Sequence, residues 1–133
     1  MNSMTFDCVF DSYAWIEYFR GSKKGEKVKN FVAGKKGVTP IIVIAELSAK
    51  YHKEGWDFWN EDLQFILAKS VIFDLTIEIA ISAGKTRKDM RKEKPNFGLA
   101  DAIILETGKN INAPILTGDP HFKGLANTFF IDE

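Results

Sequence analysis

Short apolar runs alternate with longer amphipathic segments along the whole chain. The short runs are rich in β-branched and aromatic residues, which predicts buried strands at residues 6–10, 71–73, 113–116 and 128–131, with a very short strand at Val38. The longer segments repeat apolar residues every three or four positions, which predicts helices at about residues 12–19, 25–33, 39–54, 56–69, 76–94 and 99–109. A short helical turn is expected at residues 120–125.

This alternation predicts the fold class. Strands that alternate with helices favour an α/β protein with right-handed crossovers between parallel strands. The strands are very apolar, as expected for a sheet that is covered on both faces. We therefore expect a three-layer α/β/α sandwich with a mostly parallel central sheet. A chain of 133 residues is typical of one domain, so residues 1–133 are expected to form a single unit.

Residues with strong start and stop preferences set the expected helix boundaries. Ser12 is a plausible N-cap for the first helix, and Thr76 opens the fifth. Thr39 followed by Pro40 is typical of a helix start, with threonine as the N-cap and proline at the first helical position. Pro95 is expected to end the fifth helix.

Composition adds few constraints on function. Apolar residues make up 45% of the chain, which is enough for a packed core. The 18 basic and 18 acidic residues cancel, so overall charge gives no hint of nucleic acid or membrane, although a local patch could still bind either. The single Cys8 excludes an intramolecular disulfide and a cysteine zinc cluster, and its apolar surroundings indicate a buried small hydrophobe.

Targeting signals are not apparent in the sequence. The first ten residues contain Asp7 and no basic segment, unlike a secretory signal peptide. No apolar run reaches the roughly 18–20 residues that a membrane helix needs. We expect a soluble cytoplasmic protein without a membrane partner, whose translation starts at Met1 or Met4.

Four carboxylates occupy positions where burial is expected. Glu46 and Asp101 interrupt apolar helical segments, whereas Asp11 and Asp119 follow predicted strands. A buried carboxylate costs several kcal/mol unless it is paired, hydrogen-bonded or bound to a cation. Sites in parallel α/β folds form beyond the carboxyl ends of the strands, where all four could meet. Carboxylates that converge there would repel one another and would favour Mg²⁺ or Mn²⁺, which prefer oxygen ligands.

Each carboxylate also has a purely structural interpretation. The three aspartates could cap a helix or favour its first turn, where the helix dipole stabilises an anion. Glu46 could lie on a narrow polar stripe with Lys50 and Lys53, because these positions share one helix face.

Four short motifs occur in the order and at the spacing of a known family. They are Phe10-Asp11-Ser12 with the helix that follows, Thr39-Pro40 through Glu46-Leu47, Leu99-Ala100-Asp101-Ala102, and Leu116-Thr117-Gly118-Asp119. Together they resemble the PIN-domain family, in particular the small toxin ribonucleases of the VapC type. Each motif is weakly specific by itself, but the resemblance spans residues 6–131.

The resemblance implies a PIN-like fold and a Mg²⁺- or Mn²⁺-dependent endoribonuclease. It implies that a metal-activated water cleaves the RNA phosphodiester at an acidic cluster formed by Asp11, Glu46, Asp101 and Asp119. Ser12 and Thr117 stand where the family often places a hydroxyl that supports a carboxylate or a metal-bound water. The resemblance further implies a homodimer and a small antitoxin protein that inhibits the enzyme.

Other side chains could contact the substrate or a partner. Residues 85–94 contain six basic residues, of which we predict possible RNA contacts for Lys85, Arg87, Lys88, Arg91 and Lys92. A solvated helix face is the alternative for this segment. His121 could touch substrate, although a solvated turn is the commoner place for such a histidine. Trp56 and Trp59 could stack on a base, but helix packing or a partner interface is the stronger interpretation.

Two other functions are compatible with parts of the pattern. A haloacid-dehalogenase-like phosphatase would use an aspartate after the first strand, but it needs a second aspartate two residues later, where this chain has Tyr13. A non-catalytic module could keep the fold and bind only RNA or protein. The complete set of four carboxylates argues against that alternative.

Overall fold

Five strands, six α-helices and one 3₁₀ turn are formed within residues 5–132, which are the residues that the computed structural model describes. Met1 and Met4, the two possible starts, lie outside this range. The strands are β1 (Cys8–Phe10), β2 (Gly37–Pro40), β3 (Val71–Phe73), β4 (Ile115–Thr117) and β5 (Thr128–Phe130). The helices are α1 (Ser12–Arg20), α2 (Lys23–Gly34), α3 (Ile41–Glu54), α4 (Trp59–Lys69), α5 (Ile77–Met90) and α6 (Leu99–Ile111), and the 3₁₀ turn is η1 (Pro120–Phe122).

The sheet is parallel throughout, with the strand order β3-β2-β1-β4-β5. Its central strand β1 pairs with β2 on one side and β4 on the other, with Val9 opposite both Val38 and Ile115. All three residues of β1 and of β4 are buried. The predicted α/β fold with a mostly parallel sheet is therefore confirmed, and the short strand expected at Val38 forms part of β2.

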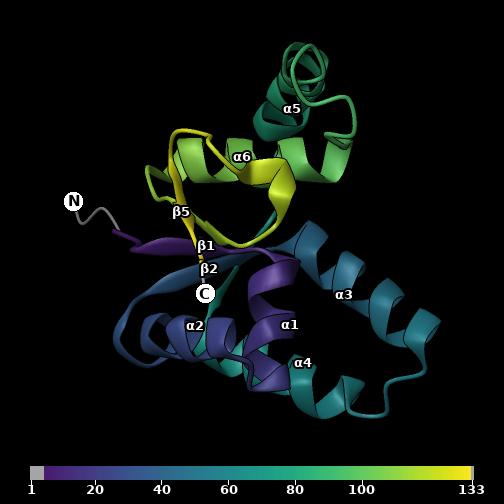
Figure 1. Ribbon diagram of the computed structural model, residues 1–133. Coiled ribbons are helices and arrows are strands. Elements are labelled where there is room, and N and C mark those ends of the chain that lie inside the picture. The colour runs from purple at the N-terminus through teal and green to yellow at the C-terminus, as the bar shows by residue number, and fades with distance from the viewer. Residues whose placement is uncertain (1–4, 133) are drawn as a thin grey trace.

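Helices cover both faces of the sheet. Figure 1 shows α1, α2 and α4 below the strands and α6 above them, with α5 packed on α6 and α3 extending from one end of the sheet. The core between the layers contains Phe10, Trp15, Phe97 and Phe122, all almost fully buried. Cys8 is buried and free, as predicted. None of the helices found between residues 5 and 132 is long and apolar enough to cross a bilayer.

Two predicted N-caps are wrong. Asp11, not Ser12, caps α1, because its carboxylate accepts a hydrogen bond of 2.8 Å from the Ala14 N–H, and Ser12 is already the first helical residue. Thr39 belongs to β2, which continues through Pro40, and α3 begins without a side-chain cap. The Thr39 hydroxyl instead accepts a 3.0 Å hydrogen bond from the Trp15 indole, so it satisfies a buried donor across the core.

The fifth helix is shorter than predicted. It ends at Met90, and a series of turns leads from Arg91 to the next helix. The Arg91 Nε donates a 2.8 Å hydrogen bond to the Phe97 carbonyl oxygen, which holds this connection in place. The expectation that Pro95 ends the helix is therefore wrong, because a proline restricts only the residue directly before it, Lys94, and the helix ends four residues earlier.

Candidate functional site

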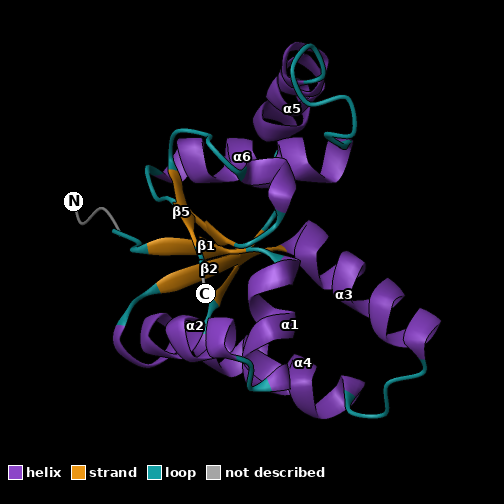
Figure 2. Ribbon diagram, in the orientation of Figure 1, coloured by secondary structure: helices purple, strands orange, loops and turns teal. Residues whose placement is uncertain are grey.

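The four predicted carboxylates come from the same end of the sheet. Asp11 directly follows β1, and Asp119 lies two residues beyond the end of β4. Glu46 lies in the second turn of α3, and Asp101 lies in the first turn of α6. Figure 2 shows that the carboxyl end of the sheet meets the beginnings of α1 and α3. The topology thus brings together side chains that are up to 108 residues apart in the sequence, counting from Asp11 to Asp119.

Asp11 is the most deeply buried of the four, with 2% of its surface exposed. Burial raises the pKa of its carboxyl group from 3.8 to about 8. The Thr117 hydroxyl and the Ala14 N–H partly oppose that rise, whereas the charges of Asp119 and Glu46 add to it. The carboxylate is therefore close enough to Asp119 and Glu46 to feel their charges.

Glu46 carries a buried oxygen without a partner. Burial, followed by the charge of Asp101, raises the pKa of the Glu46 carboxyl group from 4.5 to about 7, and the Ser12 hydroxyl partly opposes the rise. Its Oε1 atom is inaccessible and has no hydrogen-bond partner among the described residues. A buried carboxylate oxygen without a partner is costly, and a bound cation is one way to satisfy it.

Backbone donors hold the other two carboxylates. Oδ2 of Asp101 accepts a 2.8 Å hydrogen bond from the Gly98 N–H at the start of α6. Oδ1 of Asp119 accepts a 2.9 Å hydrogen bond from the His121 N–H, so Asp119 caps the short turn η1. The Asp119 N–H in turn donates to the Thr117 hydroxyl at 2.9 Å. Both aspartates are thus held in fixed positions and also have the capping roles that the sequence allowed.

His121, which the sequence indicated only as a possible substrate contact, lies within the acidic cluster. Its Nδ1 atom lies 2.9 Å from Oδ2 of Asp101 and 3.8 Å from Oδ1 of Asp119, and 40% of its side chain is exposed. The imidazole is therefore a side chain of the acidic cluster and not only part of a solvated turn. The one signal in the sequence is the Asp-Pro-His spacing, because a capping aspartate fixes the residue two positions later.

Tyr13 is a second neighbour that the sequence did not reveal. A Cβ atom on Gly118 would lie 2.5 Å from the Tyr13 ring. The ring therefore packs directly on the backbone between Thr117 and Asp119, where no side chain fits. This contact supports the loop that carries Asp119.

The basic segment lies close to the site only in part. Lys85 forms an ion pair of 3.0 Å with Asp89 on the surface of α5, which fits a solvated helix face. Arg91 is bound to the Phe97 carbonyl oxygen, immediately before Gly98. Nζ of Lys94 donates a 2.9 Å hydrogen bond to the Lys123 carbonyl oxygen, beyond η1, so the end of this segment does approach the site. RNA contacts by Lys85, Arg87, Lys88, Arg91 and Lys92 stay a prediction.

The donor set fits a hard divalent cation. Asp101, Asp119 and His121 each offer one ligand atom, and these atoms lie within 4.8 Å of one another. Asp11 and Glu46 feel the charges of this group, and the Glu46 Oε1 atom lacks a partner. Carboxylate oxygens are preferred ligands of Mg²⁺ and Mn²⁺, so these residues can hold such an ion.

We expect the metal-free protein to lose stability as the pH rises from about 4 to 8. Burial raises the pKa of Asp11 to about 8 and that of Glu46 to about 7, so the folded state holds these protons more tightly than the unfolded chain does. Their contribution to the free energy of unfolding is complete below pH 4 and is lost as the pH passes 8. Thermal unfolding in EDTA at several pH values measures the loss.

Added Mn²⁺ should restore stability most strongly at the high end of this range, because the ion binds the deprotonated carboxylates. The Asp11→Asn variant is the control, since it should flatten the pH dependence in EDTA. A melting temperature in EDTA that rises from pH 5 to pH 8.5 would contradict the expectation.

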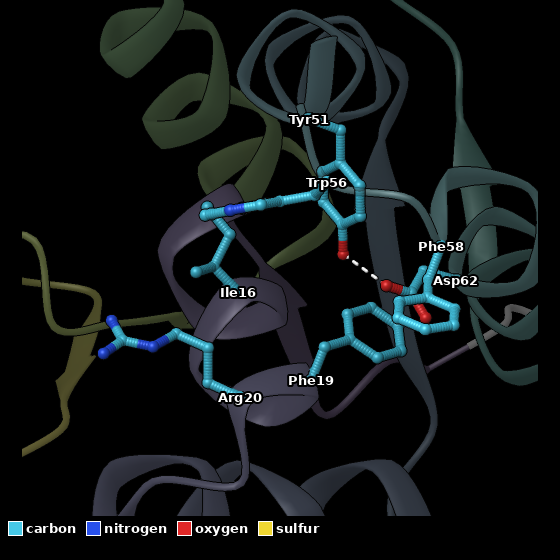
Figure 3. Close-up of a pocket in the computed structure, with 7 residues that line it drawn as sticks. All are labelled: Ile16, Phe19, Arg20, Tyr51, Trp56, Phe58 and Asp62. Carbon is cyan, nitrogen blue, oxygen red and sulfur yellow. Dashed lines mark hydrogen bonds between the residues drawn. The ribbon is translucent and has the colours of Figure 1, made fainter. Parts of the chain in front are cut away.

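A second concavity lies between α1, α3 and α4. This pocket of about 150 Å³ is lined by Ile16, Phe19, Arg20, Tyr51, Trp56, Phe58 and Asp62. Figure 3 shows the Tyr51 hydroxyl directed at Asp62, to which it donates a 2.5 Å hydrogen bond, while Arg20 points away from this pair. Its lining is mainly apolar, and Phe58 is 64% exposed. None of the four predicted carboxylates lines it, so it is separate from the acidic cluster.

Several solved toxin structures share this fold. A chain of a toxin–antitoxin complex from Klebsiella pneumoniae superposes with a TM-score of 0.76 and 19% identity, over 96% of this chain and 99% of that one. A chain of VapBC2 from Rickettsia felis, solved with a promoter DNA fragment, superposes with a TM-score of 0.71 and 17% identity, over 92% of this chain and 96% of that one. VapC20 from Mycobacterium tuberculosis is a toxin that cleaves the sarcin–ricin loop. It superposes with a TM-score of 0.66 and 14% identity, over 92% of this chain and 98% of that one. At these identities the likeness establishes the fold.

The fold and the acidic cluster define a small parallel α/β protein whose candidate site lies at the carboxyl end of the sheet. The family model of the PIN domain matches residues 8–127. The chain therefore belongs to the PIN domain family, as the four motifs indicated. No curated protein matches the sequence.

Proposed function

We propose that this protein is a metal-dependent endoribonuclease and the toxin of a toxin–antitoxin pair. The observation that carries the proposal is the convergence of Asp11, Glu46, Asp101 and Asp119, with one buried Glu46 oxygen that has no hydrogen-bond partner within residues 5–132. Membership of the PIN domain family supports nuclease activity. The fold shared with VapC20, a toxin that cleaves the sarcin–ricin loop, supports an RNA substrate for this protein.

Each side chain has a distinct part in the proposed site. Asp11, Glu46, Asp101 and Asp119 would hold Mg²⁺ or Mn²⁺, which lowers the pKa of a water and stabilises the charge that develops on a phosphate. Ser12 and Thr117 orient Glu46 and Asp11, because their hydroxyl groups favour the charged carboxylates. The Gly98 N–H fixes Asp101 so that the cluster is assembled before RNA arrives. The basic residues predicted to contact RNA phosphates are Lys85, Arg87 and Lys88 on α5 and Arg91 and Lys92 in the connection that follows it.

The proposed partners are an antitoxin protein and a second copy of this chain. The shared fold with toxins solved in toxin–antitoxin complexes supports the antitoxin. The apolar pocket beside Trp56 and Phe58 supports a protein ligand, because exposed aromatic side chains are typical of interfaces. Ile77 and Ile81, which are 79% and 71% exposed on α5, offer a surface for the second copy. A cytoplasmic location belongs to the same proposal.

The test is cleavage of a mixed RNA pool by the antitoxin-free protein. We expect cleavage with Mn²⁺, none with EDTA, and none by the Asp101→Asn variant, because that change removes one charge from the cluster. The Glu54→Gln variant is a matched control, since it makes the same acid-to-amide change at the exposed end of α3, where Glu54 pairs with Lys50. Absence of cleavage by the folded, Mn²⁺-loaded wild type would favour a binding-only module, and activity of Asp101→Asn would refute the site.

A further inference from the structure

We propose that His121 is a direct metal ligand through its Nδ1 atom, and that this nitrogen makes the site prefer Mn²⁺ over Mg²⁺. The inference deepens the proposed function, on which it rests. It adds a nitrogen donor to a site otherwise formed by carboxylate oxygens.

The distances around His121 suit a shared ion. Ligands at roughly 2.1 Å from an octahedral ion lie about 3.0 Å apart when they are adjacent and about 4.2 Å apart when they are opposite. Nδ1 of His121 lies 2.9 Å from Oδ2 of Asp101, close to the spacing of adjacent ligands. It lies 3.8 Å from Oδ1 of Asp119, between the two limits. These three atoms can therefore belong to one coordination sphere.

The local backbone fixes the ring beside both carboxylates. Asp119 caps η1, because its Oδ1 accepts a 2.9 Å hydrogen bond from the His121 N–H. The backbone of His121 is therefore held next to that carboxylate. The Gly98 N–H already donates to Oδ2 of Asp101, and this anchors the acceptor that the ring faces. The imidazole thus needs no large movement to bind the same metal ion as either aspartate.

An independent observation indicates a cation at this cluster. Oε1 of Glu46 is buried without a hydrogen-bond partner among residues 5–132, and α3, which carries Glu46, contacts α6, which carries Asp101. A simple hydrogen bond between His121 and Asp101 leaves this oxygen unsatisfied. A cation that His121, Asp101 and Glu46 share would satisfy it.

A nitrogen ligand changes the choice of metal. Mg²⁺ binds almost only oxygen and keeps several of its waters. Transition-metal ions accept imidazole more readily than Mg²⁺ does, and of the two ions proposed for this site Mn²⁺ is the transition metal. His121 should therefore strengthen Mn²⁺ binding and contribute little to Mg²⁺ binding.

The experiment measures the ion itself. Electron paramagnetic resonance of the EDTA-treated protein titrated with Mn²⁺ gives the affinity, and the electron spin echo of the bound ion shows modulation from ¹⁴N of a coordinated imidazole. We expect that modulation in the wild type and its loss in His121→Asn, which can still hydrogen-bond with Asp101 through an amide. Mn²⁺ affinity should fall about 10–100-fold, while Mg²⁺ affinity, measured by competition, should change less than about twofold.

The chain offers one matched control, because it contains only two histidines. His52 lies on the surface of α3, where its Nδ1 is 2.7 Å from the Ser48 carbonyl oxygen, and His52→Asn should leave the modulation and both affinities unchanged. Bound Mn²⁺ without imidazole modulation in the wild type would overturn the inference and leave the proposed nuclease intact. Equal losses of Mn²⁺ and Mg²⁺ affinity in His121→Asn would also overturn it, and no Mn²⁺ binding at all would overturn both proposals.

Discussion

Asp11→Asn is expected to make the metal-free protein more stable and to abolish its RNA cleavage. Asp11 is 2% exposed, and burial raises the pKa of its carboxyl group to about 8. At pH 8.5 the charged form therefore destabilises the folded state in the absence of a cation. Asparagine is neutral, is nearly the same size and remains a good N-cap for the Ala14 N–H. We expect the free energy of unfolding in EDTA to rise by roughly 1–3 kcal/mol at pH 8.5.

The same change should weaken metal binding and the chemistry that depends on it. A bound ion supplies several kcal/mol of transition-state stabilisation, so cleavage should fall by at least about 100-fold. Urea unfolding with EDTA and RNA cleavage with Mn²⁺ measure the two effects on one variant. Asp7→Asn is the control, because Asp7 is exposed beyond the other end of β1 and accepts from the Lys36 N–H. If Asp11→Asn lowers the stability in EDTA, the buried charge does not destabilise the metal-free fold. If cleavage is unchanged, Asp11 is not needed for the reaction.

Gly25→Ala is expected to be strongly destabilising, although it adds a single methyl group. Gly25 lies in the first turn of α2, and a Cβ atom there would overlap the backbone carbonyl of Glu17 on α1. A backbone obstacle cannot rotate away, so α1 and α2 would have to separate. We expect the free energy of unfolding to fall by about 2–4 kcal/mol, as measured by urea unfolding.

Gly84→Ala is the matched control for this prediction. Gly84 lies inside α5, and a Cβ atom there would meet nothing within 4 Å. Alanine is the better helix former, so this variant should gain roughly 0.5–1 kcal/mol. If the two variants have the same stability, the close approach of α1 and α2 is not a constraint on the fold.

The order of strands and helices could be predicted from local patterns. Four of the five strands are apolar runs, and the helices repeat apolar residues at helical spacing, so the fold class follows from residues that are near one another in the sequence. The exception is β2, Gly37–Pro40, of which only Val38 was expected in a strand. The predicted boundaries of the helices and strands were less accurate than their order. The prediction took Thr39 for a cap, because the sequence does not show that its hydroxyl meets the Trp15 indole across the core.

The part of the candidate site that consists of carboxylates at strand ends and in apolar helices was predictable from the sequence. Asp11 and Asp119 follow strands, and Glu46 and Asp101 interrupt apolar helices, so a parallel sheet alone brings them to one end. His121 was not predictable in the same way. Its contact with Asp101 joins residues 20 positions apart on η1 and α6, and it depends on how those two elements pack.

The sequence by itself therefore determined the class of fold, the family motifs and the identity of the four carboxylates, because these depend on composition, periodicity and strand ends. Only the tertiary structure decided that Asp11 caps α1, that one oxygen of Glu46 is buried with no partner in the described part of the chain, and that His121 reaches Asp101. The physical reason is that burial and hydrogen bonding depend on distances between elements. Those distances are set by the packing of the layers and are not encoded in any local stretch of the chain.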